Sequence, residues 1–270
     1  MQPRLIRAQA IDSVINQGWI QHCEWFTEID STSNFARRFC DCHHPLLPAV
    51  FVADQQTHGR GRSANRWWSP SGCLMMTLAI SQDHLPDEIA QQKLLSLVSG
   101  VAVCEAVEKL APCLSIQLKW PNDLYFAQRK LGGILIESLA HSSASGQPFW
   151  LIGIGLNVDV DWSSAPSDLQ TKAICISSAG AGSFQSEQLF LEIITSLRDW
   201  LRAWSMGSED WFIQLNNRSL LTDRLVRVRI PAESEFIGRC EGIDQQGRLL
   251  CRSEREMRAF SNGEIVEWST

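Results

Sequence analysis

The chain has 270 residues, 44% of them hydrophobic, and 24 Lys and Arg against 30 Asp and Glu give a formal charge of −6. This length is sufficient for one large domain, or for a large and a small one, with a substantial core. A mildly acidic chain has no overall attraction to nucleic acid or to an anionic membrane surface, so a site for phosphate must be a local basic cluster.

The sequence shows no feature of a secreted or membrane protein. The N-terminus lacks an apolar run followed by a small-residue cleavage site, and no apolar stretch approaches the length that crosses a bilayer. The nine cysteines, an odd number without a repeated spacing, fit reduced thiols rather than a disulfide framework. We therefore expect a cytoplasmic protein without a membrane partner.

Hydrophobic periodicity predicts mixed helices and strands before Leu220. The opening helix, in which Ile11, Val14 and Ile15 precede a stop at Gly18, leaves little room for a helix-turn-helix, so we expect no nucleic-acid partner. Further helices are expected at 31–39, 86–110 and 186–204, the one at 86–110 being long and amphipathic. Strands are expected at 23–29, 48–54, 73–80, 115–120, 131–137 and 150–158.

Four residues of metal-binding type stand close together at Cys40, Cys42, His43 and His44. A structural zinc site usually draws ligand pairs from two separated segments, and no second cluster follows in the sequence. We interpret these residues as the end of a helix that runs into a loop.

The pattern changes after Leu220. The segments LVRVRI, EFIGRCEGI, GRLLCR and GEIVEW alternate polar and apolar residues with period two, and Gly, Asp and Asn separate them. This pattern predicts a small all-β unit, with a domain boundary near residues 216–222.

A polar loop before the third strand is rich in glycine and arginine. The loop and its flanks contain Gln56, Gly59, Arg60, Gly61, Arg62, Arg66 and Trp67. Alternating glycine and arginine lets the backbone approach a ligand while guanidinium groups bind phosphate or carboxylate. An indole beside them can stack on a nucleobase. Exposed Arg-Gly loops are often merely solvated, so this segment alone identifies no function.

Three further segments lie at predicted strands. The turn Pro121-Asn122-Asp123 ends a strand, and its carboxylate can hold Mg²⁺ beside a polyphosphate, although an ordinary turn has the same residues. Lys130 precedes two glycines that enter an apolar strand, an arrangement typical of close approach by another molecule or of a simple bulge. The segment GIGLNV lacks the third glycine and the following helix of a dinucleotide-binding fingerprint, and the chain contains no phosphate loop of the Walker type.

Taken in order, these segments resemble the biotin protein ligase family. The similarity runs from Asp30-Ser31-Thr32 through GRGR, WWSPSG, KWPNDLY, KLGGILIE and GIGLNV, and it covers the chain from about residue 23 to the end. KWPND followed by KLGGILIE at this spacing is its most specific part. The family commonly continues GRGR with Arg-Gly-Arg, where this chain has Ser63-Ala64-Asn65.

The resemblance implies an α+β fold. Its expected form is a mixed β-sheet flanked by helices, as in class II aminoacyl-tRNA synthetases and biotin ligases, followed by a small C-terminal SH3-like β-barrel. It implies a catalytic domain at residues 1–218 and the barrel at 219–270. Some family members add an N-terminal DNA-binding domain, for which this chain has no room, so it resembles the ligase-only class.

The resemblance also implies an activity. A biotin protein ligase joins biotin to ATP as biotinyl-5′-AMP and transfers biotin to a lysine of the biotin carboxyl carrier domain of a carboxylase. Expected ligands are therefore biotin as substrate, ATP as co-substrate and Mg²⁺, with no tightly bound cofactor. The carrier domain is the expected partner, and a homodimer also fits because family members dimerise in different ways.

Functional positions of the family fall on named residues of this chain. The catalytic positions are matched by Lys130, Arg60 and Arg62. The biotin-binding positions are matched by Ser31, Thr32, Ser33, Gln56, Gly59, Arg60, Gly61, Arg62, Lys130 and Gly133. The nucleotide-binding positions are matched by Arg66, Trp67, Asn122, Asp123, Lys130 and Asn157, with Asp123 as the expected Mg²⁺ ligand.

Two alternatives compete with this function. A lipoate or octanoate protein ligase shares the fold and the adenylate chemistry, but the pairing of KWPND with KLGGILIE favours biotin. A non-catalytic biotin-binding regulator is the second alternative, and the retained Lys130 argues against it.

Overall fold

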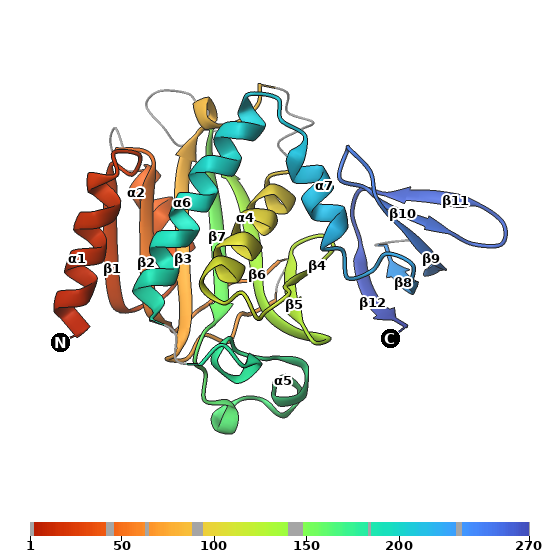
Figure 1. Cartoon of the computed structure of the whole chain (residues 1–270), viewed down its shortest axis with the longest axis horizontal. Helices are drawn as coiled ribbons and strands as arrows, with labels where there is room; N and C mark the ends of the chain where they lie inside the picture. Colours follow the sequence, from red (N-terminus) through yellow and green to blue (C-terminus); the bar gives the residue numbers. More distant parts are fainter. Residues whose placement is uncertain are drawn as a thin grey trace.

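Two β-sheets organise the chain (Figure 1). The computed structural model describes residues 3–41, 46–62, 65–87, 94–139, 148–182, 185–230 and 234–269. A seven-stranded sheet is followed along the chain by a five-stranded one. None of the helices in these described ranges combines the length and hydropathy that crossing a bilayer requires.

The seven-stranded sheet is mixed, as expected. Its strand order is β1-β2-β3-β7-β6-β5-β4, and β1 runs parallel to β2 while every other pair is antiparallel. The strands are β1 (His22–Ile29), β2 (Ala49–Gln56), β3 (Cys73–Ser81), β4 (Gln117–Lys119), β5 (Asp123–Phe126), β6 (Arg129–Leu139) and β7 (Phe149–Asn157). The central strands β3 and β7 are apolar and almost wholly buried, as strands covered on both faces must be, whereas β6 is buried at only part of its residues.

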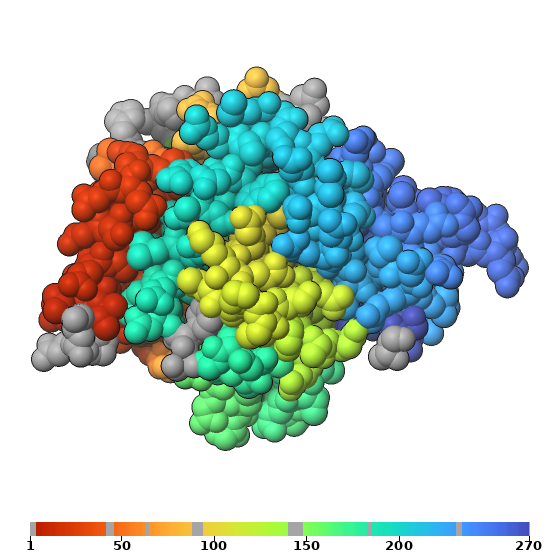
Figure 2. Space-filling model, in the orientation of Figure 1, coloured from red at the N-terminus to blue at the C-terminus, as the bar shows by residue number. Residues whose placement is uncertain are grey.

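Helices cover both faces of this sheet. The α-helices are α1 (Pro3–Asn16), α2 (Thr32–Asp41), α4 (Leu95–Leu110), α5 (Ser167–Lys172), α6 (Ser186–Ser205) and α7 (Asp210–Asn217). Short 3₁₀ turns occupy Gln82–His84, Trp162–Ser164 and Ser177–Ala179. Figure 2 shows α1, α6 and α4 side by side on one face of the molecule, with the C-terminal sheet projecting beyond them.

Strand alternation separates two cores. In β2, Val50 and Val52 belong to the large core beneath α4 and α6, whereas Ala49 and Phe51 belong to a smaller core beneath α2. Because α2 has only ten residues, it covers only part of its face of the sheet. The part it leaves uncovered becomes the floor of the cleft described below.

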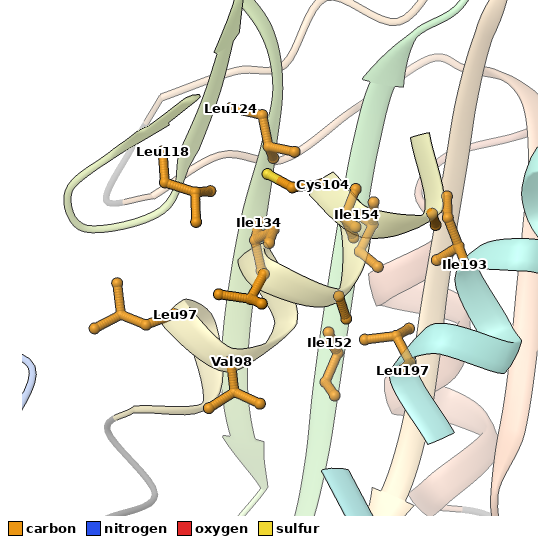
Figure 3. Packing of buried hydrophobic residues seen from close by; sticks show 14 of the residues in the cluster. Leu97, Val98, Cys104, Leu118, Leu124, Ile134, Ile152, Ile154, Ile193 and Leu197 are labelled. Carbon is orange, nitrogen blue, oxygen red and sulfur yellow. The ribbon is translucent and has the colours of Figure 1, made fainter. Parts of the chain in front are cut away.

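Helix α4 differs from its prediction. An amphipathic helix was expected over 86–110, but Pro86 and Asp87 are not helical, residues 88–93 lie outside the described part, and the helix begins at Leu95. It is buried almost all round because it lies between the sheet and α6. Figure 3 shows Leu97, Val98 and Cys104 of α4 among apolar side chains of the sheet and of α6.

Several smaller expectations were also wrong or incomplete. Asp123 was expected in a turn but begins the short strand β5, which is too brief to produce a periodic pattern. In α1, Val14 is fully buried whereas Ile15 is 39% exposed, because the buried stripe of this helix follows Ala10 and Val14 instead. Cys40 is buried in α2, but Cys42, His43 and His44 lie outside the described residues.

The C-terminal strands confirm the period-two prediction. Strands β8 (Leu225–Arg229), β9 (Phe236–Ile243), β10 (Leu249–Arg252), β11 (Met257–Phe260) and β12 (Glu264–Trp268) form an antiparallel sheet in the order β11-β10-β9-β8-β12. Alternate residues of β9 are buried. The sheet fits a small SH3-like unit, but within the described residues no pairing of β11 with β12 closes it into the expected barrel.

Candidate active site

A cleft of about 1150 Å³ opens where the seven-stranded sheet approaches the C-terminal sheet. One side of the cleft is lined by residues of β6, β7 and α5, of the arginine loop (57–66) and of the KWPND segment (119–123). Residues of the C-terminal sheet line the other side. The lining contains most of the predicted site: Ser31, Thr32, Ser33, Gln56, Arg60, Gly61, Arg62, Arg66, Trp67, Asn122, Asp123, Lys130, Gly133 and Asn157. Gly59 lies just behind it, in contact with Trp67 and Ser69.

The floor of the cleft is a shelf of two paired glycines, Gly133 of β6 and Gly155 of β7. The indole of Trp67 lies on this shelf, and a Cβ at Gly155 would lie 2.9 Å from its Cε2 atom. Only glycine therefore lets an aromatic ring lie this close to the strands. The Nε1–H of Trp67 is buried against this shelf and has no hydrogen-bond partner among the described residues.

Lys130 stands beside this shelf. Its Nζ atom is 2.6 Å from Oδ1 of Asp123 and 5.4 Å from the centre of the Trp67 ring. The side chain is 32% exposed, so the ammonium remains accessible from the cleft. A cation placed between a carboxylate and an aromatic face can transfer from the carboxylate to an incoming anion.

The two arginines of the loop point to different ends of the cleft. Arg60 forms a bidentate pair with Glu137 on β6, with distances of 2.7 and 3.1 Å, and Arg37 of α2 donates to the same carboxylate at 2.8 Å. Arg62 donates to Oδ1 of Asn122 at 3.2 Å. The loop thus brings one guanidinium to the α2 side of the cleft and one to the KWPND side.

Arg66 remains within the loop. Its guanidinium donates to the backbone carbonyl of Thr57, and its backbone forms an isolated bridge with Arg60. Ser63 and Ala64, where the chain departs from the family pattern, lie outside the described residues. Asn65 accepts a backbone hydrogen bond from Gly61 at 2.9 Å, which closes the tip of the loop.

A buried hydroxyl cluster lies at the other end, where α2 begins. Oε1 of Gln56 accepts from the backbone N–H and the hydroxyl of Thr32 at 2.7 and 3.1 Å. Thr77 of β3 donates to Thr32 at 2.9 Å and lies 3.1 Å from the hydroxyl of Ser33. Neutral, buried donors and acceptors suit an uncharged polar group of a ligand, because such a group needs partners once it leaves water. The sequence did not point to Thr77, which lies in an otherwise apolar strand.

The start of α2 is fixed by Asp30. Its carboxylate accepts from Asn34 at 3.0 Å and from both terminal nitrogens of Arg38 at 3.2 Å. The hydrogen bonds from Arg38 lower the pKa of Asp30 to about 2, so this carboxylate stays ionised at neutral pH. The helix start is therefore held in place from outside the cleft.

Asn157 acts on Lys130 through the backbone. Its side chain is buried, and its amide group donates to the carbonyls of Lys130 and Ile174 at 3.3 and 3.1 Å. Asn122 is fixed in a similar way, because it donates to the carbonyl of Ile134 at 2.7 Å. Both residues line the cleft and also hold neighbouring strands in register.

Replacing Asn157 by alanine is expected to lower the free energy of unfolding by about 2 kcal/mol, because two hydrogen bonds to backbone carbonyls are lost and the carbonyl of Lys130 keeps only the backbone N–H of Ile174. Urea denaturation of the wild-type and variant proteins measures the difference. Asn216→Ala is a matched control, since Asn216 also donates to two backbone carbonyls but lies outside the cleft lining. The affinity for a molecule that binds in the cleft is expected to fall in Asn157→Ala and to stay unchanged in Asn216→Ala. Equal ligand affinity in both variants would contradict a role in the site.

Two charged residues of the site were missed in the sequence. Glu137 pairs with Arg37 and Arg60, which are 100 and 77 residues away, so no local pattern reveals it. Lys119 lines the cleft beneath the C-terminal sheet, where burial lowers the pKa of its ammonium to about 8. Glu137 does not line the cleft itself but binds Arg60, which does, whereas Lys119 is one of the lining residues.

The cleft combines lysine and arginine cations, an aromatic ring on a glycine shelf and a neutral hydroxyl cluster, which together suit an amphiphilic anion and a nucleotide. This set is suited to an enzyme that joins a small carboxylate to a nucleotide. The sequence pattern of the Biotin/lipoate A/B protein ligase family matches residues 25–157. That range runs from β1 to the end of β7 and includes the predicted site residues.

Curated relatives agree with this match. The chain is similar to the biotin--[acetyl-CoA-carboxylase] ligase of Mycobacterium tuberculosis, with 29% identity over 80% of this chain and 78% of that protein. It is also similar to the bifunctional ligase/repressor BirA of Salmonella typhimurium, with 30% identity over 79% of this chain. The alignment spans only 65% of that repressor's length.

Solved structures share the whole fold. The chain is similar to a biotin protein ligase from Aquifex aeolicus in complex with biotin and ATP, with a TM-score of 0.76, 25% identity and coverage of 93% of this chain and 98% of that one. The chain therefore contains a Biotin/lipoate A/B protein ligase family domain at residues 25–157.

Proposed function

We propose that this chain is a biotin protein ligase, which activates biotin with ATP and transfers it to a lysine of a biotin carboxyl carrier domain. The observation that carries the proposal is Lys130 beside the Trp67–glycine shelf, in a chain that resembles a ligase crystallised with biotin and ATP. Biotin has a neutral ureido ring and a carboxylate. The uncharged hydroxyl cluster at the other end of the cleft matches the ring, and the cation matches the carboxylate.

The first step joins two anions. A carboxylate oxygen of biotin attacks the α-phosphorus of ATP, and the bond to the pyrophosphate leaving group breaks. We assign Lys130 to the biotin carboxylate and α-phosphate, where its charge offsets the repulsion between them and stabilises charge that develops at phosphorus. In this assignment Lys130 exchanges Asp123 for the ligand, while Arg60 and Arg62 bind the adenylate from different ends of the cleft.

The second step consumes the acyl-adenylate. The neutral amine of an acceptor lysine attacks the acyl carbon, AMP leaves, and an amide forms. Closure of the arginine loop and the C-terminal sheet over the intermediate would exclude water that otherwise hydrolyses it. We place the ureido ring against Ser31, Thr32, Ser33 and Gln56, and the adenine against Trp67.

Mg²⁺ fits the residues at the KWPND end. Magnesium prefers one or two protein oxygens together with phosphate and water, and Asp123 with Asn122 offers that set. In the described part of the chain no cluster of three or more His, Cys, Asp or Glu residues could form an all-protein cage. When bound, the ion would neutralise charge on the phosphates, with Asp123 as its protein ligand.

Several further assignments are part of the proposal. The catalytic domain comprises residues 1–218, and the C-terminal unit comprises 219–270. The protein acts in the cytoplasm, and its macromolecular partner is the carrier domain rather than nucleic acid or membrane. A homodimer is compatible with the position of β1 at the edge of the large sheet.

Pyrophosphate exchange tests the activation step. Labelled pyrophosphate is expected to enter ATP when biotin and Mg²⁺ are present. Lipoate or octanoate should support less than about 1% of that rate, because neither has a ureido group to hydrogen-bond with the hydroxyl cluster. Exchange with lipoate but not with biotin would keep the fold and overturn the substrate. Tight biotin binding with no exchange would favour the non-catalytic regulator.

A further inference from the structure

The KWPND segment contacts both parts of the molecule. On one side, Nζ of Lys119 donates to the carbonyl of Ile265 in β12 at 3.2 Å and lies 4.3 Å from the centre of the Trp268 ring. Nε1 of Trp120 donates to the carbonyl of Gly247, between β9 and β10, at 2.9 Å. Two consecutive side chains at the end of β4 thus bind one strand of the C-terminal sheet, β12, and the turn between β9 and β10.

The same segment binds the catalytic cations on its other side. Asn122 accepts from Arg62, and Asp123 pairs with Lys130. These two residues follow Trp120 after the single residue Pro121. The position of the C-terminal sheet and the position of the site cations are therefore linked through five residues of backbone.

The C-terminal sheet also forms a wall of the cleft. Its lining residues include Arg229, Glu235, Gly263, Glu264 and Ile265. Ile265 belongs both to this wall and to the hydrogen bond with Lys119. Movement of β12 away from Lys119 would therefore open the cleft on the KWPND side, which the proposed function assigns to the nucleotide.

We propose that Lys119 and Trp120 are positioning residues that hold the C-terminal sheet closed over the nucleotide end of the cleft and so set the affinity for MgATP. The inference rests on the proposed function for the identity of the nucleotide. It assigns no contact with the reacting atoms to either side chain.

The energetics of Lys119 agree with a positioning role. Burial lowers the pKa of its ammonium to about 8, against a usual value of 10.5. Burying the charged form therefore costs folding free energy. This cost is fully present below pH 8 and disappears as the pH rises from 8 to 10.5. A buried methionine would avoid this cost, so a lysine here contributes little net stability.

The test compares variants by two measurements, the Kd for MgATP and the Kd for biotin. Lys119→Met keeps the length of the side chain but removes the charge, and Trp120→Phe keeps a ring but removes the N–H donor. We expect each variant to raise the Kd for MgATP about 10-fold, because each loses one hydrogen bond or cation–π contact. The Kd for biotin should change less than about twofold. Lys119→Arg, which can donate to Ile265 and stack on Trp268, should restore affinity to within about threefold.

Matched controls lie on the helical face. Lys109→Met and Trp200→Phe remove the same groups from contacts with Glu192 and Glu105, outside the cleft lining, and should leave both Kd values unchanged. An unchanged Kd for MgATP in Lys119→Met and Trp120→Phe would overturn the inference. A parallel loss of both affinities, with no rescue by Lys119→Arg, would show general destabilisation and overturn it as well.

Failure of the proposed function gives a different pattern. If the wild-type protein binds MgATP but shows no exchange with biotin, the proposed substrate fails while the Kd comparison still tests the positioning role. If the wild-type protein does not bind MgATP, both the proposed function and this inference are contradicted.

Discussion

Lys130→Met is expected to slow formation of the acyl-adenylate about 1000-fold, near the upper effect of removing one group that stabilises developing charge. The side chain is 32% exposed, so its ion pair with Asp123 contributes little stability and the variant should fold normally. Rapid quenching after mixing enzyme, biotin and MgATP measures the rate of adenylate formation directly. Lys130→Arg should recover only part of the activity, because a planar guanidinium does not replace a point charge.

Lys109→Met is the matched control for this prediction. Lys109 also pairs with a carboxylate, Glu192, but it lies on α4 outside the cleft lining, so adenylate formation should be unchanged. A rate for Lys130→Met within about threefold of wild type would show that the lysine contributes no transition-state stabilisation. The assignment of the catalytic cation would then be wrong, and Arg62 would be the next candidate.

Asp123→Asn is expected to raise the Mg²⁺ concentration for half-maximal adenylate formation roughly 10- to 100-fold, because a neutral amide replaces the proposed carboxylate ligand. Titration of Mg²⁺ at fixed ATP and biotin gives this concentration. Removal of the ion with a chelator should abolish activity in both proteins, and restored Mg²⁺ should recover it.

Asp123 also pairs with Lys130, and the same titration separates the two roles. If the carboxylate acts only by holding the lysine, the rate falls but the Mg²⁺ requirement stays the same, which contradicts the proposed ligand. Asp12→Asn, an exposed carboxylate of α1 outside the cleft lining, is the control and should change neither quantity.

Short-range patterns predicted most of the secondary structure. Apart from β5, the bounds expected from hydrophobic periodicity agree within a few residues with the strands of the large sheet, α6 and the C-terminal strands. The agreement arises because burial on one or both faces fixes which residues of a segment are apolar. Helix α4 was less well predicted, since burial on nearly all sides removes the polar face that marks the start of a helix. The four-residue strand β5 has no period to detect.

Only part of the site was predicted, and that part was found from unusual residues rather than from periodicity. Glycines, arginines and Lys130 stand out locally because such residues are unusual beside buried strands, and the order of the motifs resembles one family. Glu137 and Thr77 were not predicted, since their roles depend on partners in distant segments. The contacts of Lys119 and Trp120 with the C-terminal sheet depend on the placement of that sheet, which no local pattern contains.

The most direct test of the central claim is the mass of a purified biotin carboxyl carrier domain after incubation with this protein, biotin and MgATP. We predict a gain equal to one biotin per carrier domain. The gain should depend on MgATP, be accompanied by release of AMP and be lost in Lys130→Met. An unchanged carrier mass with biotin would contradict the proposed function, whether lipoate is transferred instead or neither compound is.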